Sequence, residues 1–293
     1  MAITRKICRF DLHFRAVRVL CLDARGREIN GAYGSGFIRR ENGHHFLYTC
    51  WHLVTGYDMY QIDPKKLPDR MAIRVLLQNV GELPAVTASG TPAGVCEIVG
   101  GCQSVDIPLY ESATGPAYKP RWYQDKKDKP DVSLNAIGIR VPFWRDAVKI
   151  QLPDAVPLSN VQLIDDEHCS LHSPDVGDRV LIVGYPYGYS SNGMEQPTPV
   201  VFSRFVAASR VSDRRTVSLL DGAGAPGMSG GPIFVETETE ILLAGIYTGA
   251  IYPAWLQHMD AKDAALGTYC NLLWTWKVDP LVPYAVTDSG GSL

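Results

Sequence analysis

The sequence predicts an all-β chain folded in two halves. Segments of alternating or continuous apolar and β-branched residues recur at short intervals along the 293 residues, whereas helical periodicity is weak. Glycine (27 residues) and proline (20 residues) are frequent enough to end many short strands. The length also suits two packed units of about 130 residues each, since domains most often contain about 100–150 residues.

The first half contains four candidate strands, at residues 15–22, 34–39, 46–50 and 71–78. Between the second and the third, Glu41-Asn42-Gly43 predicts a hairpin turn, because Asn and Gly tolerate positive φ. An apolar run at 132–141 follows a charged loop and is a candidate buried strand. Residues 80–130 are rich first in glycine and proline and then in charge, so we expect an insertion of long loops or an extra hairpin there.

The connector between the halves is placed at residues 142–160, which mix polar and apolar residues around three prolines. The predicted units are therefore residues 1–148 and 149–293. Candidate strands of the second unit lie at 179–183, 199–209, 216–220, 231–235 and 241–247. A helix is expected at 253–265, and a turn or short helix near 279–284.

Composition and charge exclude several classes of protein. With 46% hydrophobic and 20% charged residues, the chain is neither disordered nor a coiled coil. A formal net charge of −3 gives no electrostatic reason to expect nucleic acid or an anionic membrane as a partner. Charges interrupt the N-terminal segment, and no apolar stretch approaches the length of a membrane span. Neither a signal peptide nor a transmembrane helix is therefore expected.

The seven cysteines are odd in number and irregularly spaced, and none belongs to a C-x-x-C pair. We expect free thiols and a cytoplasmic protein, where thiols stay reduced. Cys96 and Cys102, with His168 and Cys169, are conceivable zinc ligands. Structural zinc sites, however, use close pairs of ligands. Buried small hydrophobic residues are the better interpretation, and no metal or cofactor is expected.

A glycine-rich turn, Gly227-Met228-Ser229-Gly230-Gly231, holds the candidate nucleophile. A serine hydroxyl becomes reactive when a base removes its proton. Glycines allow the backbone to approach closely, so the N–H groups of Gly227 and Ser229 can face one concavity and stabilise an oxyanion. Alone, the same string also fits a glycine-rich hairpin with an incidental serine.

His52, which ends the segment Thr49-Cys50-Trp51-His52, is the candidate base that takes the proton from the serine. Asp131, just before the apolar run 132–141, is the candidate carboxylate that orients the imidazole, and Asp106 is the reserve candidate. Each residue alone is better explained as structural. Together, in the order His, Asp and Ser, they predict a catalytic triad with Ser229.

These motifs resemble those of the trypsin/chymotrypsin-like serine proteases, and within them the bacterial HtrA-like branch. The blocks GSGFI, LYTCWHLVTG, DVSLNAIGI, VLIVGYPYG, DGAGAPGMSGGPIF and LLAGIYTG follow the family's order across residues 15–277. The resemblance implies two six-stranded antiparallel β-barrels with the active site in the cleft between them. It further implies a serine endopeptidase that forms an acyl-enzyme on restricted protein or peptide substrates, without a cofactor. A regulatory protein partner is a further expectation.

The resemblance also assigns substrate contacts. Five residues would pair with the substrate backbone as an added strand: Ile246, Tyr247, Thr248, Gly249 and Ala250. Thr248 would also sit beside the triad carboxylate. Ala223, six residues before Ser229, would form the base of the primary pocket, so we expect a preference for small or medium apolar side chains. Met228 stands where the family has an acidic residue, so an activating ion pair with a new N-terminus cannot form.

Two other interpretations stay open. One is a non-catalytic or partner-activated trypsin-like module that binds peptides in the same cleft. The other is an α/β-hydrolase esterase, because Gly227-x-Ser229-x-Gly231 also matches the G-x-S-x-G elbow of that fold. The elbow needs a helix after the serine and a later histidine. Here a strand-like segment follows, and His258 is the single later histidine.

Overall fold

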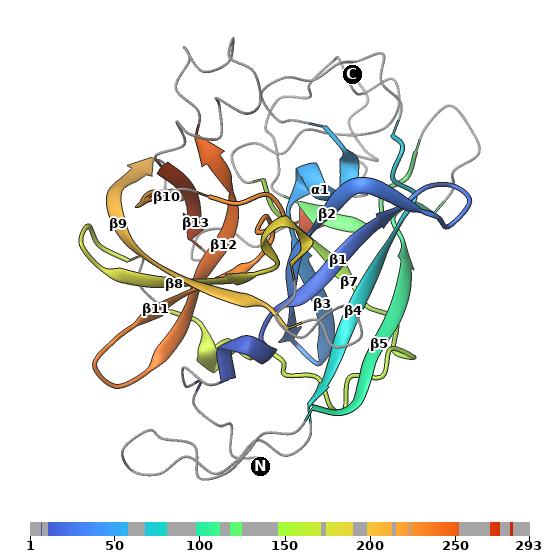
Figure 1. The fold of residues 1–293 in the computed structure, drawn as a ribbon, viewed down its shortest axis with the longest axis horizontal. Coiled ribbons are helices and arrows are strands. Elements are labelled where there is room, and N and C mark those ends of the chain that lie inside the picture. Colours follow the sequence, from blue (N-terminus) through green and yellow to red (C-terminus); the bar gives the residue numbers. More distant parts are fainter. Residues whose placement is uncertain are drawn as a thin grey trace, which may run out of the picture.

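The computed structural model describes Ile7 and residues 11–57, 68–80, 98–111, 118–124, 146–170, 174–189, 198–212, 215–222, 224–251, 270–275 and 282–283. The chain forms two antiparallel β units that lie side by side (Figure 1). Eight strands form a sheet in the order β14-β6-β7-β3-β2-β1-β4-β5, and six close into a barrel in the order β10-β13-β12-β11-β8-β9. The predicted all-β class with two antiparallel units is confirmed, and the second unit forms the predicted six-stranded barrel; among the described residues, the first unit forms an eight-stranded sheet in place of the predicted six-stranded barrel.

The strands of the sheet are β1 (Val17–Leu22), β2 (Glu28–Glu41), β3 (His44–Thr49), β4 (Ala72–Val80), β5 (Ile98–Pro108), β6 (Trp122–Gln124), β7 (Val148–Gln151) and β14 (Val282–Pro283). Those of the barrel are β8 (Arg179–Gly184), β9 (Val200–Ser212), β10 (Arg215–Asp221), β11 (Pro232–Glu236), β12 (Ile241–Ile251) and β13 (Cys270–Thr275). The helical turns are η1 (Asp11–Phe14), α1 (Trp51–Thr55), η2 (Asp166–His168) and η3 (Pro186–Gly188). Among the described residues, no helix has the length and apolar character of a membrane span.

The predicted hairpin between β2 and β3 is confirmed. Glu41 pairs with His44 across a two-residue turn. Asn42 (φ 48°) and Gly43 (φ 81°) both lie in the left-handed region, which gives the turn the twist of the flanking strands. The hairpin places β3, and the residues that follow it, in the middle of the sheet.

One expectation about the eight-stranded sheet is right and two are wrong. The extra-hairpin interpretation of the insertion is right for β5, which runs antiparallel to β4. β7 lies inside the segment 142–160, which was expected to be a connector without strands. The turn or short helix expected near 279–284 is wrong at residues 282–283, which form β14 against β6. The predicted strand at 132–141 and the predicted helix at 253–265 lie outside the described residues.

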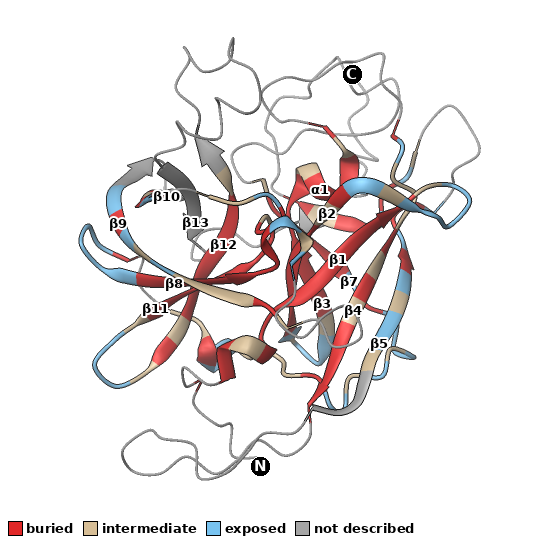
Figure 2. Cartoon of the chain, in the orientation of Figure 1, coloured by how far each residue is buried: buried red, intermediate tan, exposed pale blue. Residues whose placement is uncertain are grey.

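The two units share a hydrophobic core. Phe37 of β2 and Tyr48 of β3 stack with ring centroids 5.2 Å apart. They belong to the same buried cluster as Leu181 of β8, Phe234 of β11 and Ile246 of β12. Figure 2 shows buried residues continuing from the sheet strands into the barrel strands. Burying a side chain of this size contributes roughly 1.5–3 kcal/mol, so this cluster fixes one unit against the other.

The cysteines whose side chains the structure describes are free thiols: Cys21, Cys50, Cys102 and Cys169. Cys21 and Cys50 are buried, as expected of small hydrophobic residues, and burial raises the pKa of the Cys21 thiol to about 11. Cys96 lies outside the described residues. In the part of the chain that the structure describes, Cys102, His168 and Cys169 do not converge as a metal-ligand group.

Candidate active site

His52 lies on α1, a five-residue helix that begins two residues after β3 ends. The other four residues of α1 are buried, so His52 is the one left partly exposed. The helix ends at Gly56, whose φ of 75° lets its N–H donate to His52 O at 2.9 Å. Arg70 Nη1 donates to the same carbonyl oxygen, also at 2.9 Å. Two donors therefore fix the carbonyl group of the residue that carries the imidazole.

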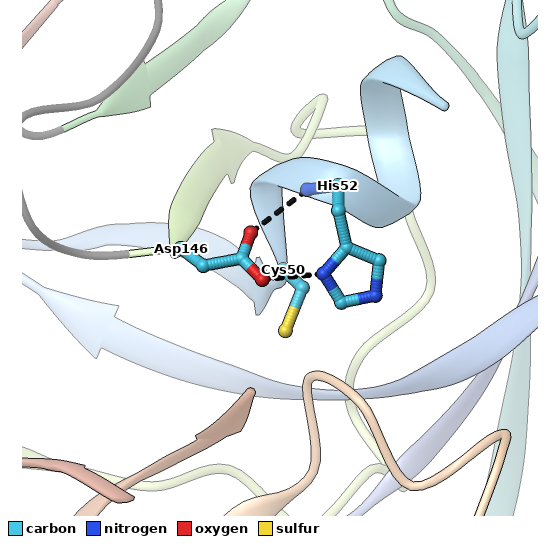
Figure 3. Close-up of side chains that lie close together, drawn as sticks. All are labelled: Cys50, His52 and Asp146. Atoms are coloured by element: carbon cyan, nitrogen blue, oxygen red, sulfur yellow. Dashed lines mark hydrogen bonds and ion pairs between the residues drawn. The ribbon is translucent and has the colours of Figure 1, made fainter. Parts of the chain in front are cut away.

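Asp146 orients the imidazole of His52. Its Oδ1 accepts the backbone N–H of His52 at 2.8 Å, and its Oδ2 lies in a short contact with His52 Nδ1 (Figure 3). A carboxylate accepts hydrogen bonds, so the ring proton sits on Nδ1 and the lone pair of Nε2 is left facing away from Asp146. This is the tautomer that a general base requires.

The strand register explains how Asp146 reaches the histidine. β7 pairs with β3, and Val148 lies opposite Thr49. Asp146, two residues before Val148, therefore falls beside the start of α1. The geometry depends on pairing between segments that lie about 100 residues apart in the sequence.

The carboxylate predicted for this role, Asp131, lies outside the described residues. The contact predicted for it is made by Asp146, which sequence reasoning missed. The reserve candidate, Asp106, is engaged elsewhere: its carboxylate accepts two hydrogen bonds from Arg74, at 2.7 and 2.9 Å, between β4 and β5. This pairing lowers the pKa of Asp106 and keeps it away from His52. The signal for Asp146 in the sequence is its position as an acidic residue directly before residues 147–151, where apolar and polar residues alternate.

Ser229 lies in the turn of residues 227–231, which enters β11. Gly231 N–H donates to Met228 O at 2.9 Å, and Gly230 N–H donates to Tyr247 O at 2.7 Å. Met228 is buried in the core of the barrel. Because a strand and not a helix follows the turn, the α/β-hydrolase interpretation is wrong.

Ser35 of β2 joins this turn to the first unit. Its N–H donates to Ser229 O at 2.8 Å, and its hydroxyl donates to Gly227 O at 2.7 Å. The same hydroxyl accepts the N–H of Tyr185 at 3.0 Å. Ser35 O accepts the hydroxyl of Thr49 at 2.8 Å. Since Ser35 is fully buried, these hydrogen bonds have no competition from water and fix the turn against β2.

Ser35→Ala is expected to lower the free energy of unfolding by about 1–3 kcal/mol, because Gly227 O and the Tyr185 N–H would lose their buried partner. Urea denaturation measures this loss. Ser203→Ala is the matched control: its hydroxyl accepts Arg179 Nε at 2.8 Å on the exposed surface, and the change there should stay within about 0.5 kcal/mol. Equal losses in both variants would contradict the assignment.

The turn requires glycine at two positions. Gly227 has φ 92°, and a Cβ there would lie 2.3 Å from Tyr185 O. Gly230 has φ 89°, and a Cβ there would lie 2.1 Å from Ser35 O. Within the part of the chain that the structure describes, the N–H groups of Gly227 and Ser229 have no intramolecular acceptor. Two backbone donors are thus available to an external acceptor.

The segment that carries the base and the segment that carries the nucleophile meet at one carbonyl group. Cys50, two residues before His52, directs Sγ to Tyr247 O at 3.4 Å. Gly230, the residue after Ser229, donates to the same oxygen at 2.7 Å. Three of the predicted site residues, His52, Gly227 and Ser229, therefore lie at the junction of the two units.

The hydroxyl of Ser229 donates to Thr248 O at 3.4 Å. The hydrogen bonds described for Ser229 do not include one to His52. Catalytic hydrogen bonds are often long or poorly aligned without substrate and tighten when it binds.

The predicted substrate strand is part of β12. Ile246, Tyr247 and Thr248 are buried, and Gly249 is partly exposed. One edge of β12 pairs with β13 through this region. On the other edge, the described pairing with β11 reaches Ile246 and goes no further. Beyond Ile246 this edge contacts the serine turn, because Gly230 N–H donates to Tyr247 O at 2.7 Å and the hydroxyl of Ser229 donates to Thr248 O at 3.4 Å. The side chain of Ala250 and the whole of Ala223 lie outside the described part.

Comparisons with known proteins give low similarities. No model of a protein family matches the chain, and no curated protein matches it. Among solved structures, a thermostable serine protease, AL20, from an extremophilic microorganism is similar with 10% identity and a TM-score of 0.45, over 90% of this chain and 91% of that one. Human heparin binding protein is similar with 14% identity and a TM-score of 0.45, over 92% and 89%.

The protease Anisep from Arthrobacter nicotinovorans is similar with 10% identity and a TM-score of 0.43, over 89% of this chain and 90% of that one. At identities of 10–14% and TM-scores of 0.43–0.45, these likenesses do not show which reaction the chain performs. The function therefore has to be inferred from the residues of the site.

Proposed function

We propose that the chain is a serine endopeptidase that cleaves peptide bonds through Ser229, His52 and Asp146. The observation that carries the proposal is the double hydrogen bond of Asp146 to His52, beside a glycine turn that holds Ser229 at the junction of the two units. This combination gives the imidazole one defined tautomer, and the neighbouring turn supplies a candidate nucleophile.

The proposed reaction proceeds through an acyl-enzyme. Nε2 of His52 takes the proton from Ser229 Oγ as the oxygen attacks the peptide carbonyl, and the N–H groups of Gly227 and Ser229 donate to the oxyanion. The protonated imidazole, stabilised by Asp146, returns the proton to the leaving amine. Water then hydrolyses the ester by the reverse sequence of proton transfers.

Substrate selection is proposed from the sequence motifs and from the position of β12 beside the turn that holds Ser229. An extended peptide would pair with residues 248–250 as an added strand, which selects unstructured segments of protein substrates. Ala223 would form the base of the primary pocket and favour small or medium apolar side chains. We also propose that the chain belongs to the HtrA-like branch, that a protein partner regulates it, and that it acts in the cytoplasm.

Reaction with a fluorophosphonate probe tests the function directly. The folded chain should become labelled at Ser229, and Ser229→Ala should abolish labelling, because the probe requires an activated serine. Ser203→Ala, at an exposed serine, should label like the unmodified chain. Undiminished labelling of Ser229→Ala, or an unreactive folded chain, would contradict the proposal.

One observation favours a partner-activated module as the second candidate. The hydroxyl of Ser229 is directed to Thr248 O, and its described bonds do not include His52. In that case labelling should be absent in the chain alone and appear when a peptide occupies the strand edge. Labelling of the chain alone, at a rate that added peptides only reduce by competition, would exclude this candidate.

A further inference from the structure

Three different metal-ligating side chains converge at the proposed site. Sγ of Cys50, a ring nitrogen of His52 and a carboxylate oxygen of Asp146 all lie within 4.8 Å of one another, and Nδ1 is the ring nitrogen that faces Asp146. Figure 3 shows the three side chains clustered at the start of α1. Cys50 is the extended N-cap residue of α1, His52 comes from the helix itself, and Asp146 from the segment before β7. Cys50 has no part in the proposed hydrolysis, so its thiol can serve a second role there.

We propose that these three side chains form an inhibitory site for a thiophilic divalent cation, with Zn²⁺ as the ligand. The inference rests on the proposed function, because occupation of the site would inactivate the peptidase. One thiolate, one imidazole and one carboxylate are all accepted zinc ligands, and water supplies the fourth position.

The spacing is compatible with one ion. Zinc lies 2.0–2.3 Å from its ligands, so ligand atoms on one ion are about 3–4 Å apart. The ligand atoms lie within 4.8 Å of one another, so binding requires small shifts: the short contact between His52 Nδ1 and Asp146 Oδ2 widens to admit the ion, and the wider separations close slightly. Cys50 is buried, whereas the side chain of His52 is 32% exposed, so an ion would enter from the histidine side. Sγ of Cys50 directs its proton to Tyr247 O at 3.4 Å.

Inhibition follows from the proton positions. The metal requires the thiolate, so the proton of Cys50 is released to solvent. It also requires the lone pair of Nδ1, so the neutral ring must carry its proton on Nε2 instead. A ring protonated at Nε2 has no lone pair to accept the proton of Ser229. The ion also removes Asp146 from its orienting role, so zinc binding and proton transfer exclude each other.

Metal binding is tested in the full-length Ser229→Ala chain, which reports on the site independently of activity. Zn²⁺ alone is titrated by calorimetry, and Cd²⁺ alone is followed by the ultraviolet charge-transfer absorption of a cadmium–thiolate bond. Adding Cys50→Ser should weaken zinc binding at least 10–100-fold, the loss typical even of outer-shell partners, and should remove the cadmium absorption. Cys21→Ser is the matched control, since Cys21 is equally buried and lies outside the cluster.

Inhibition is tested on the unmodified chain, with each variant compared with its own metal-free rate. Zinc should inhibit the unmodified chain and Cys21→Ser alike, and should inhibit Cys50→Ser only at concentrations at least about tenfold higher. Cys50→Ala, whose folding is checked by thermal unfolding, tests whether the serine hydroxyl introduced by Cys50→Ser itself changes the response to zinc. Absence of zinc binding, or cadmium absorption that survives Cys50→Ser, would overturn the proposal. Zinc binding in a chain that never hydrolyses peptides would instead contradict the proposed function and leave the metal site standing.

Discussion

Asp146→Asn is expected to lower kcat for peptide hydrolysis by about 10⁴-fold. The side-chain amide keeps the shape of the carboxylate, and its oxygen can still accept the backbone N–H of His52. Its NH₂ group, however, donates to Nδ1 and favours the ring tautomer that carries its proton on Nε2. That tautomer cannot accept the proton of Ser229. Steady-state kinetics should show the loss in kcat with KM little changed, because the substrate contacts are elsewhere.

Asp131→Asn separates the two carboxylates that compete for this role. If Asp146 orients the imidazole, the asparagine at 131 leaves kcat unchanged within a few-fold. The same holds for Asp106→Asn, because Asp106 pairs with Arg74. A 10⁴-fold loss at Asp131 together with a small loss at Asp146 would return the triad assignment to Asp131.

The barrel could be predicted closely from the sequence. The segments expected as strands at 179–183 and 216–220 are β8 (Arg179–Gly184) and β10 (Arg215–Asp221). The reason is physical, since each carries enough apolar or β-branched side chains to be recognised from its own residues. β13 (Cys270–Thr275) was not predicted, although it closes the barrel between β10 and β12.

β7 and Asp146 could not be predicted in the same way. β7 has four residues, too few to show a period, and prolines lie at positions 142, 153 and 157 around it. It is a strand because β3 and β6 both pair with it, and that information is tertiary. Asp131, which stands before a longer apolar run, carried the stronger local signal and was chosen for that reason.

The histidine and the serine could be predicted because their surroundings are local. The turn at 227–231 needs glycines wherever it occurs, and these are visible in the sequence. The contribution of Ser35 was not predicted, since GSGFI identifies a strand but not its hydrogen bonds to a turn about 190 residues away. Cys50 was likewise visible only as one of seven cysteines, and its place between His52 and Asp146 comes from the fold.

Gly227→Ala is expected to lower kcat/KM by about 10²–10³-fold, the effect of losing one oxyanion donor. The added methyl group would lie 2.3 Å from Tyr185 O, a backbone atom that cannot rotate away. The turn must therefore shift, and the N–H of Gly227 shifts with it. Fluorophosphonate labelling should slow in parallel, because the probe's phosphoryl oxygen uses the same donors. Urea denaturation measures the accompanying loss of stability.

Gly177→Ala is the matched control, because Gly177 has nearly the same φ in open surroundings. Its φ is 95°, against 92° for Gly227, and no atom lies within 4 Å of the position of its added Cβ. Backbone strain alone should cost this variant about 1–3 kcal/mol and leave kcat/KM unchanged. The difference between the two alanine variants therefore isolates the collision with Tyr185 O. If both variants lost the same stability and neither lost activity, Gly227 would be a conformational glycine without an oxyanion role.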